Sequence, residues 1–117
     1  MSSGLEIQVE ESEDKSVLRL EGRIDASSAS ILEKQIGKHL DGKSSKLLLD
    51  FTKIAYLSSA GMRILLSATK KFKGQGGLLF FFGMNKEVMD IVKMAGFERI
   101  LPIYPNEKKA LEALKNS

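Results

Sequence analysis

Two serines and a glycine lie where an apolar run changes into a helical pattern, at Ser58, Ser59 and Gly61. Ser58 or Ser59 could cap the helix, an interaction that contributes roughly 1 kcal/mol. A cap does not explain Gly61, because a glycine in a helix costs about 1 kcal/mol relative to alanine. We therefore expect another group to approach the backbone there. The free amides of a helix start also favour an anion, so a phosphate on Ser59 would be stabilised, although a cap explains the serines equally well.

Other residues offer weaker chemistry. Asp25 and Asp50 could act as an acid/base couple, but polar residues are common at strand ends. With no cysteine and a single histidine, His39, we expect no metal site, and we expect His39 to lie on the surface in mid-helix. Gln75–Gly77 resembles a phosphate-binding loop only in its glycines. It precedes an expected strand and lacks the Gly-Lys-Ser/Thr ending, so we interpret it as a turn.

Length and composition predict one globular domain over residues 1–117, with residues 1–4 as a flexible tail. The chain is 43% hydrophobic and 28% charged, with a formal net charge of +3. The uneven spread of charge could steer a charged partner, but a solvated surface is the simpler interpretation. Its four arginines are well separated, which argues against nucleic acid, and no long apolar run predicts a membrane span.

Hydrophobic periodicity predicts the order β-β-α-β-α-β-α-β-α, a mixed sheet of four to five strands with about four helices. Strands that alternate with single helices favour parallel pairing, and the first two strands favour an antiparallel hairpin. The first helix has Ser27, Ser28 and Ser30 as possible caps and ends near Leu40, at Asp41-Gly42. The expected strands cover 5–10, 17–22, 46–51, 78–82 and 100–104, and the later helices 59–72, 85–95 and 106–114.

The stretch Leu47–Leu66, "LLLDFTKIAYLSSAGMRILL", strongly resembles the signature of the STAS domain, and within it the bacterial anti-sigma factor antagonists. Gly22–Asp25, Asn85–Val88 and Gly96–Phe97 support the resemblance, which covers nearly the whole chain. It implies a single α/β domain of the STAS type.

The resemblance also implies a function. Such a protein binds an anti-sigma factor that is also an ATP-dependent serine kinase, and this binding releases the sigma factor. The kinase phosphorylates the antagonist on the serine that corresponds to Ser59, and a metal-dependent serine phosphatase reverses the modification. The chain would then be a cytoplasmic binding protein without a cofactor, and not an enzyme. Many members have aspartate before the phosphoserine, where this chain has Ser58, so Ser58 is an alternative acceptor.

Residues around Ser59 would form the partner-binding surface: Asp25, Ser58, Gly61, Met62 and Arg63. The family places an aspartate that contacts the partner at the position of Asp25. Met62 begins the apolar stripe of its helix and fits the core better than an interface, and Arg63 is either a contact to an acidic partner or an ordinary solvated arginine.

Two other functions stay open. The chain could be a STAS module of another system, such as a lipid-transport ABC subunit or a stressosome-like scaffold, without regulatory phosphorylation. It could also be a small phosphohydrolase or nucleotide-binding enzyme that uses Asp25 and Asp50.

Overall fold

The computed structural model describes residues 4–40 and 45–117. The predicted order of elements is confirmed. The strands are β1 Leu5–Glu11, β2 Ser16–Ile24, β3 Lys46–Leu57, β4 Leu78–Phe82 and β5 Ile103–Tyr104, and the helices are α1 Ala29–Gly37, α2 Ser59–Gly74, α3 Lys86–Met94 and α4 Glu107–Lys115. The expected tail falls largely on residues 1–3, and the expected helix stop at Asp41-Gly42 falls on 41–44. Both lie outside the described residues.

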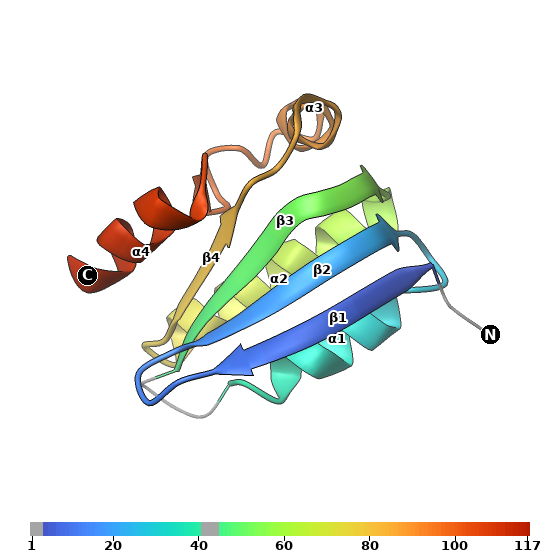
Figure 1. Cartoon of the computed structure of the whole chain (residues 1–117). Coiled ribbons are helices and arrows are strands. Elements are labelled where there is room, and N and C mark those ends of the chain that lie inside the picture. The colour runs from blue at the N-terminus through green and yellow to red at the C-terminus, as the bar shows by residue number, and fades with distance from the viewer. Residues whose placement is uncertain (1–3, 41–44) are drawn as a thin grey trace.

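The five strands form one sheet in the order β1-β2-β3-β4-β5 (Figure 1). β1 pairs antiparallel with β2, and every later neighbour pairs in parallel. The mixed sheet is thus confirmed, with the hairpin at one edge and the carboxyl ends of β2, β3 and β4 at a common end. Such ends carry the loops that enter the following helices, so this end of the sheet is where α1, α2 and α3 begin.

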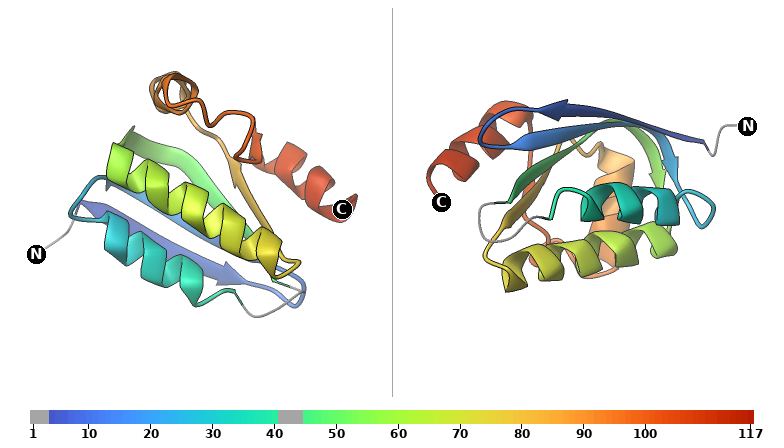
Figure 2. Two further views of the ribbon diagram at one scale, coloured as in Figure 1. Left: turned by 180° about the vertical axis from the view of Figure 1, so that it is seen from behind. Right: turned by 90° about the horizontal axis from the view of Figure 1, so that it is seen from below.

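Helices cover the two faces of the sheet unequally (Figure 2). α1, α2 and α3 contribute to the main core on one face, with residues such as Leu32, Leu65 and Val92. α4 packs on the other face through Ala110 and Leu114, against a smaller cluster from β2, β3 and β4. The part of this second face near β1 and β2 carries polar side chains that alternate with the core residues of the strands.

Three element ends differ from the prediction by three residues or more. β5 begins at Ile103 and not at Ile100, because residues 98–100 form a turn. α1 ends at Gly37 and not near Leu40. β3 runs to Leu57, six residues past the expected end, because the pairing of β2 with β3 shifts between Arg19 and Glu21 and again between Gly22 and Arg23. At each shift the partner β3 gains a residue, so its buried side chains recur every three residues instead of every two. This spacing hides the strand from a search for strict alternation.

Candidate functional site

Ser58 and Ser59 lie at the junction of β3 and α2, but their hydroxyl groups are in different situations. Ser58 is the N-cap of α2: its Oγ accepts a hydrogen bond from the Gly61 amide at 3.1 Å. Ser59 is the first residue of the helix and is exposed. Within residues 4–40 and 45–117, no hydrogen bond engages the Ser59 hydroxyl. The cap and the accessible hydroxyl therefore belong to two different serines, and Ser59 is the one open to a macromolecule.

Asp25 lies next to this junction, in the loop between β2 and α1. The link is a hydrogen bond of 2.8 Å from the Ser58 amide to the Ile24 carbonyl, at the point where Ile24 pairs with Leu57. The sheet thus brings Asp25 and Ser58-Ser59, which are more than 30 residues apart in sequence, to one end of the sheet.

The Asp25 carboxylate is held by its own loop. Its Oδ1 accepts from the Ser27 hydroxyl at 2.7 Å, and from the amides of Ser27 and Ser28 at 3.0 and 3.2 Å. The hydrogen bond from the Ser27 hydroxyl, with the amide hydrogen bonds, lowers the pKa of Asp25 below its usual range. Ser28 occupies the N-cap position of α1, but its Oγ donates to the Arg23 carbonyl and makes no side-chain cap. Asp25 is therefore a fixed negative charge at neutral pH.

Gly61 and Met62 lie inside the protein, so neither is a partner contact as predicted; for Met62 this confirms the core position that the apolar stripe favoured. A Cβ on Gly61 would lie 2.6 Å from Cγ2 of Ile24 and 2.8 Å from Cδ1 of Leu57. The group that approaches the Gly61 backbone is thus the end of β2 and β3, not a bound partner. Met62 is 2% exposed and belongs to the main core. Of Gly61, Met62 and Arg63, only Arg63 is exposed.

An exposed arginine–tyrosine pair at the same end was not predicted. The Arg23 guanidinium lies over the Tyr56 ring at 4.5 Å from its centroid. The pairing register of β2 and β3 sets these two residues side by side, one position before Ile24 and Leu57. Arginine and tyrosine are enriched at interface hot spots, so the pair extends the candidate surface onto the other face of the sheet. The two extra residues in β3 hid this register from the sequence.

Asp50 is not part of this site, so the acid/base couple with Asp25 is wrong. Its Oδ2 accepts from Arg19 at 3.0 Å, and its Oδ1 accepts from the Thr52 amide and hydroxyl. β3 continues for seven residues from Asp50 to Leu57, the residue beside Ile24, which is roughly 20 Å of strand. Asp50 instead belongs to an ion-pair network in which Arg19 also binds Glu10 and Glu107.

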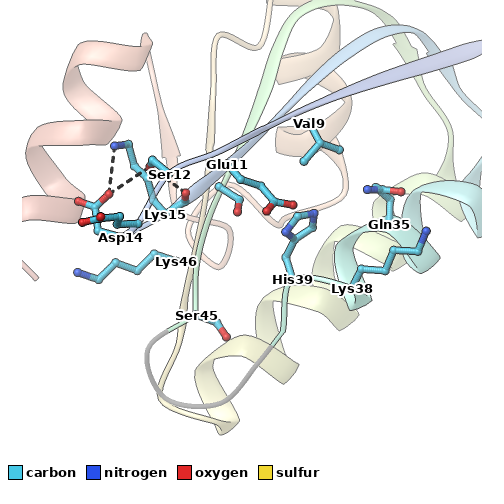
Figure 3. A pocket seen from close by; sticks show the side chains of 12 residues that line it. Val9, Glu11, Ser12, Asp14, Lys15, Gln35, Lys38, His39, Ser45 and Lys46 are labelled. Carbon is cyan, nitrogen blue, oxygen red and sulfur yellow. Dashed lines mark hydrogen bonds and ion pairs between the residues drawn. The ribbon is translucent and has the colours of Figure 1, made fainter.

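A hollow of about 430 Å³ lies at the opposite end of the sheet, between the β1–β2 turn and the end of α1 (Figure 3). His39 lines it, past the end of α1, and the ring faces the side of the hollow where Glu11 lies. The residue is half-buried, and within the described chain its Nε2 is buried without a hydrogen-bond partner. The expectation of a surface histidine in mid-helix is therefore wrong. None of the predicted site residues lines this hollow.

Other features carry less chemistry. Gln75–Gly77 forms the turn that ends α2, as predicted, with Gly76 at φ 76°. Among the residues with described positions, no three His, Cys, Asp or Glu side chains come together as a metal site, and no helix is long and apolar enough to cross a membrane.

Comparisons with known proteins agree with this geometry. The model of the STAS domain family matches residues 6–110. The anti-sigma F factor antagonist of Paenibacillus polymyxa is 25% identical over 95% of this chain and 96% of its own length. A crystal structure of an anti-sigma factor antagonist from Mycobacterium paratuberculosis superposes with a TM-score of 0.85, at 24% identity, over 98% of this chain and 97% of that one.

The anti-sigma factor antagonist SpoIIAA has been solved in two forms that are similar to this chain. The unphosphorylated form gives a TM-score of 0.78 at 16% identity, over 96% of this chain and 98% of that one. The phosphorylated form, from Bacillus, gives 0.71 at 14% identity, over 93% and 99%. The fold and the family match together define the class: this chain belongs to the STAS domain family. Within that family it is similar to proteins named as anti-sigma factor antagonists.

Proposed function

We propose that this chain is an anti-sigma factor antagonist: it binds an anti-sigma factor that is also a serine kinase, and thereby releases a sigma factor. Phosphorylation of Ser59 by that kinase would switch the binding off, and a metal-dependent serine phosphatase would restore it. The chain would work in the cytoplasm as a binding protein and kinase substrate, without a catalytic activity of its own. The observation that carries the proposal is the exposed Ser59 hydroxyl at the start of α2, beside the cap Ser58 and the ionised Asp25.

The local structure suits a phosphorylation switch. Ser58 supplies the cap through its own side chain, so α2 keeps its start when Ser59 is modified. The helix dipole and the free amides of the first turn favour the negative charge of a phosphate there. We therefore expect the modified protein to keep the same fold, with the change confined to the charge of this surface.

The magnitude is sufficient for a switch. A phosphate adds about −1.5 to −2 charges at neutral pH. One like-charge pair at ~4 Å and an effective dielectric of ~20 costs roughly 4 kcal/mol. Moving a binding equilibrium from 1:99 to 99:1 takes about 5.5 kcal/mol. A phosphate dianion that faces one carboxylate of the partner, with Asp25 already negative beside it, supplies a term of this size.

The test combines the purified chain with a histidine-kinase-like ATPase from the same organism and Mg-ATP, and maps the phosphate by mass spectrometry. We expect the phosphate on Ser59, its loss in Ser59→Ala, and its retention in Ser58→Ala and in the exposed-serine control Ser30→Ala. Binding to the kinase should survive Ser59→Ala and weaken strongly in Ser59→Asp.

Three results would count against the proposal. Phosphate on Ser58 would show that Ser58, and not Ser59, is the acceptor. Kinase binding without any phosphate would favour a STAS module of another system. Turnover of a nucleotide or phosphoester by the chain alone would favour an enzyme.

A further inference from the structure

All the charged side chains of helix α2 are positive. Residues 59–74 contain Arg63, Lys70, Lys71 and Lys73 and no aspartate or glutamate. All four cationic residues are exposed. The other helices each carry at least one acidic residue, such as Glu33 in α1. The positive charge of α2 is therefore not balanced within its own helix.

Three of the four cations share one face with Ser59. Arg63, Leu66, Lys70 and Lys73 follow Ser59 by 4, 7, 11 and 14 residues, which is the spacing of one face of an α-helix. We call these four residues the basic stripe. The opposite face of the helix is buried in the main core through Met62, Leu65, Ala68 and Phe72. Figure 2 shows that the outer side of α2 is not covered by another element.

The basic stripe is also unengaged and slightly hollowed. Within the part of the chain that the structure describes, none of its cations forms an ion pair. A hollow of about 310 Å³ lies over it, lined by Arg63, Leu66, Ser67, Lys70 and Lys71. The half-buried Leu66 thus gives an apolar contact between charged neighbours, an arrangement that suits a protein side chain framed by carboxylates.

We propose that the basic stripe binds an acidic segment of the partner protein, in a contact that runs along α2 from Ser59; this rests on the proposed function. A protein fits better than the other polyanions. A surface for single-stranded nucleic acid combines cations with exposed aromatic side chains, and the stripe has none. A surface for duplex DNA typically neutralises about six to ten phosphates, and the stripe has three cations. A helix that lies in a membrane surface needs an apolar face toward the lipid, and that face of α2 is buried in the core.

The position of the stripe adds a second effect to phosphorylation. Ser59 and Arg63 are separated by four residues, and an acidic group that precedes a basic one by four residues is the favourable order on a helix. A phosphate on Ser59 would therefore pair with Arg63, and withdraw the first cation of the stripe from the partner. The same phosphate would repel the partner's acidic segment.

The test uses two double variants of the full chain. Lys70→Glu/Lys73→Glu reverses two charges of the stripe. Lys108→Glu/Lys115→Glu is the matched control on α4, because all four lysines are exposed and because Lys73 and Lys115 each lie in the last turn of their helix. Far-ultraviolet circular dichroism verifies that both are folded, and Lys70→Gln/Lys73→Gln serves as a milder second variant. Affinity for the same histidine-kinase-like ATPase is measured from 50 to 300 mM NaCl.

We expect Lys70→Glu/Lys73→Glu to weaken kinase binding about ten-fold at low salt, with a shallower salt dependence, and the control to change it less than about two-fold. Equal kinase affinities of wild type and both variants would refute the proposed role of the basic stripe and would leave the proposed function unaffected. Absence of kinase binding by the wild type would instead refute the proposed function. The stripe variant could instead keep its kinase affinity but lose a binding that wild type shows to vesicles with 30% phosphatidylserine or to duplex DNA. That result would assign the stripe to the other polyanion and overturn the proposal.

Discussion

Replacing Gly61 by alanine tests how closely the end of the sheet packs against the first turn of α2. Gly61 does not have a positive φ, so the added methyl group causes no backbone strain of its own. It would instead lie 2.6 Å from Ile24 Cγ2, 2.8 Å from Leu57 Cδ1 and 3.2 Å from the Ile24 carbonyl oxygen. The first two distances are far below ordinary van der Waals contact, so side chains of the core must move.

Two opposing terms set the magnitude. Alanine gains up to about 1 kcal/mol over glycine as a helix former. Adding a methyl group to a well-packed core costs about 1–3 kcal/mol. The close contacts with Ile24 and Leu57, both at most 1% exposed, place Gly61 toward the upper end of that range. We therefore expect Gly61→Ala to lower the free energy of unfolding by about 1–2 kcal/mol.

Gly74 provides the matched control at the other end of the same helix. A Cβ there would meet nothing within 4 Å, so Gly74→Ala keeps the propensity gain without the packing cost. Urea unfolding followed by circular dichroism compares the two variants, and we expect Gly74→Ala to be stabilised by about 0.5 kcal/mol or more. If Gly61→Ala is as stable as Gly74→Ala, the contact between α2 and the sheet is looser than the structure describes, and the account of Gly61 is refuted.

Three further results are expected. Ser58→Ala should lose about 1 kcal/mol of stability in urea unfolding because its Oγ caps α2, whereas Ser58→Asp should stay close to wild type; a neutral Ser58→Ala would contradict the cap. In urea unfolding, Arg19→Met should lose about 2–3 kcal/mol of stability because it leaves the largely buried Asp50 without its cation, whereas Glu10→Gln, at an exposed member of the network, should lose far less; equal losses would refute this ranking. In the folded protein the pKa of Asp25 is below its usual value of 3.8. Its contribution to stability is therefore present above that pH and is lost as the pH falls through the lower pKa of the folded protein. In urea unfolding from pH 5 to pH 2, the free energy of unfolding should fall more steeply for wild type than for Asp25→Asn, and parallel curves would contradict this.

Local patterns in the sequence determined most of the elements. Helical spacing, cap residues and apolar runs are properties of short segments, and they act before distant parts of the chain meet. Asn85 shows this well: it was predicted to cap α3, and its Oδ1 accepts from the Val88 amide at 2.9 Å. Strict alternation failed only for the second half of β3, where the shifts in pairing with β2 change the spacing of buried residues.

The candidate site shows what the sequence could not determine. The sequence suggested Ser59 and left Ser58 open, because both serines fit a helix start; only the backbone geometry assigns the cap to Ser58 and leaves Ser59 exposed. Gly61 was expected to face a partner, because a glycine in a helix indicates that some group lies close to its backbone. The sequence does not say whether that group belongs to a partner or to the protein's own core.

Tertiary structure decided these points because they depend on which surfaces meet. The parallel pairing of β2 with β3 places Ile24 over Gly61 and Asp25 beside Ser58, and it separates Asp25 from Asp50 along the strand. A sequence records the spacing of residues along one chain, whereas burial and proximity arise from the register between strands that are distant in that chain.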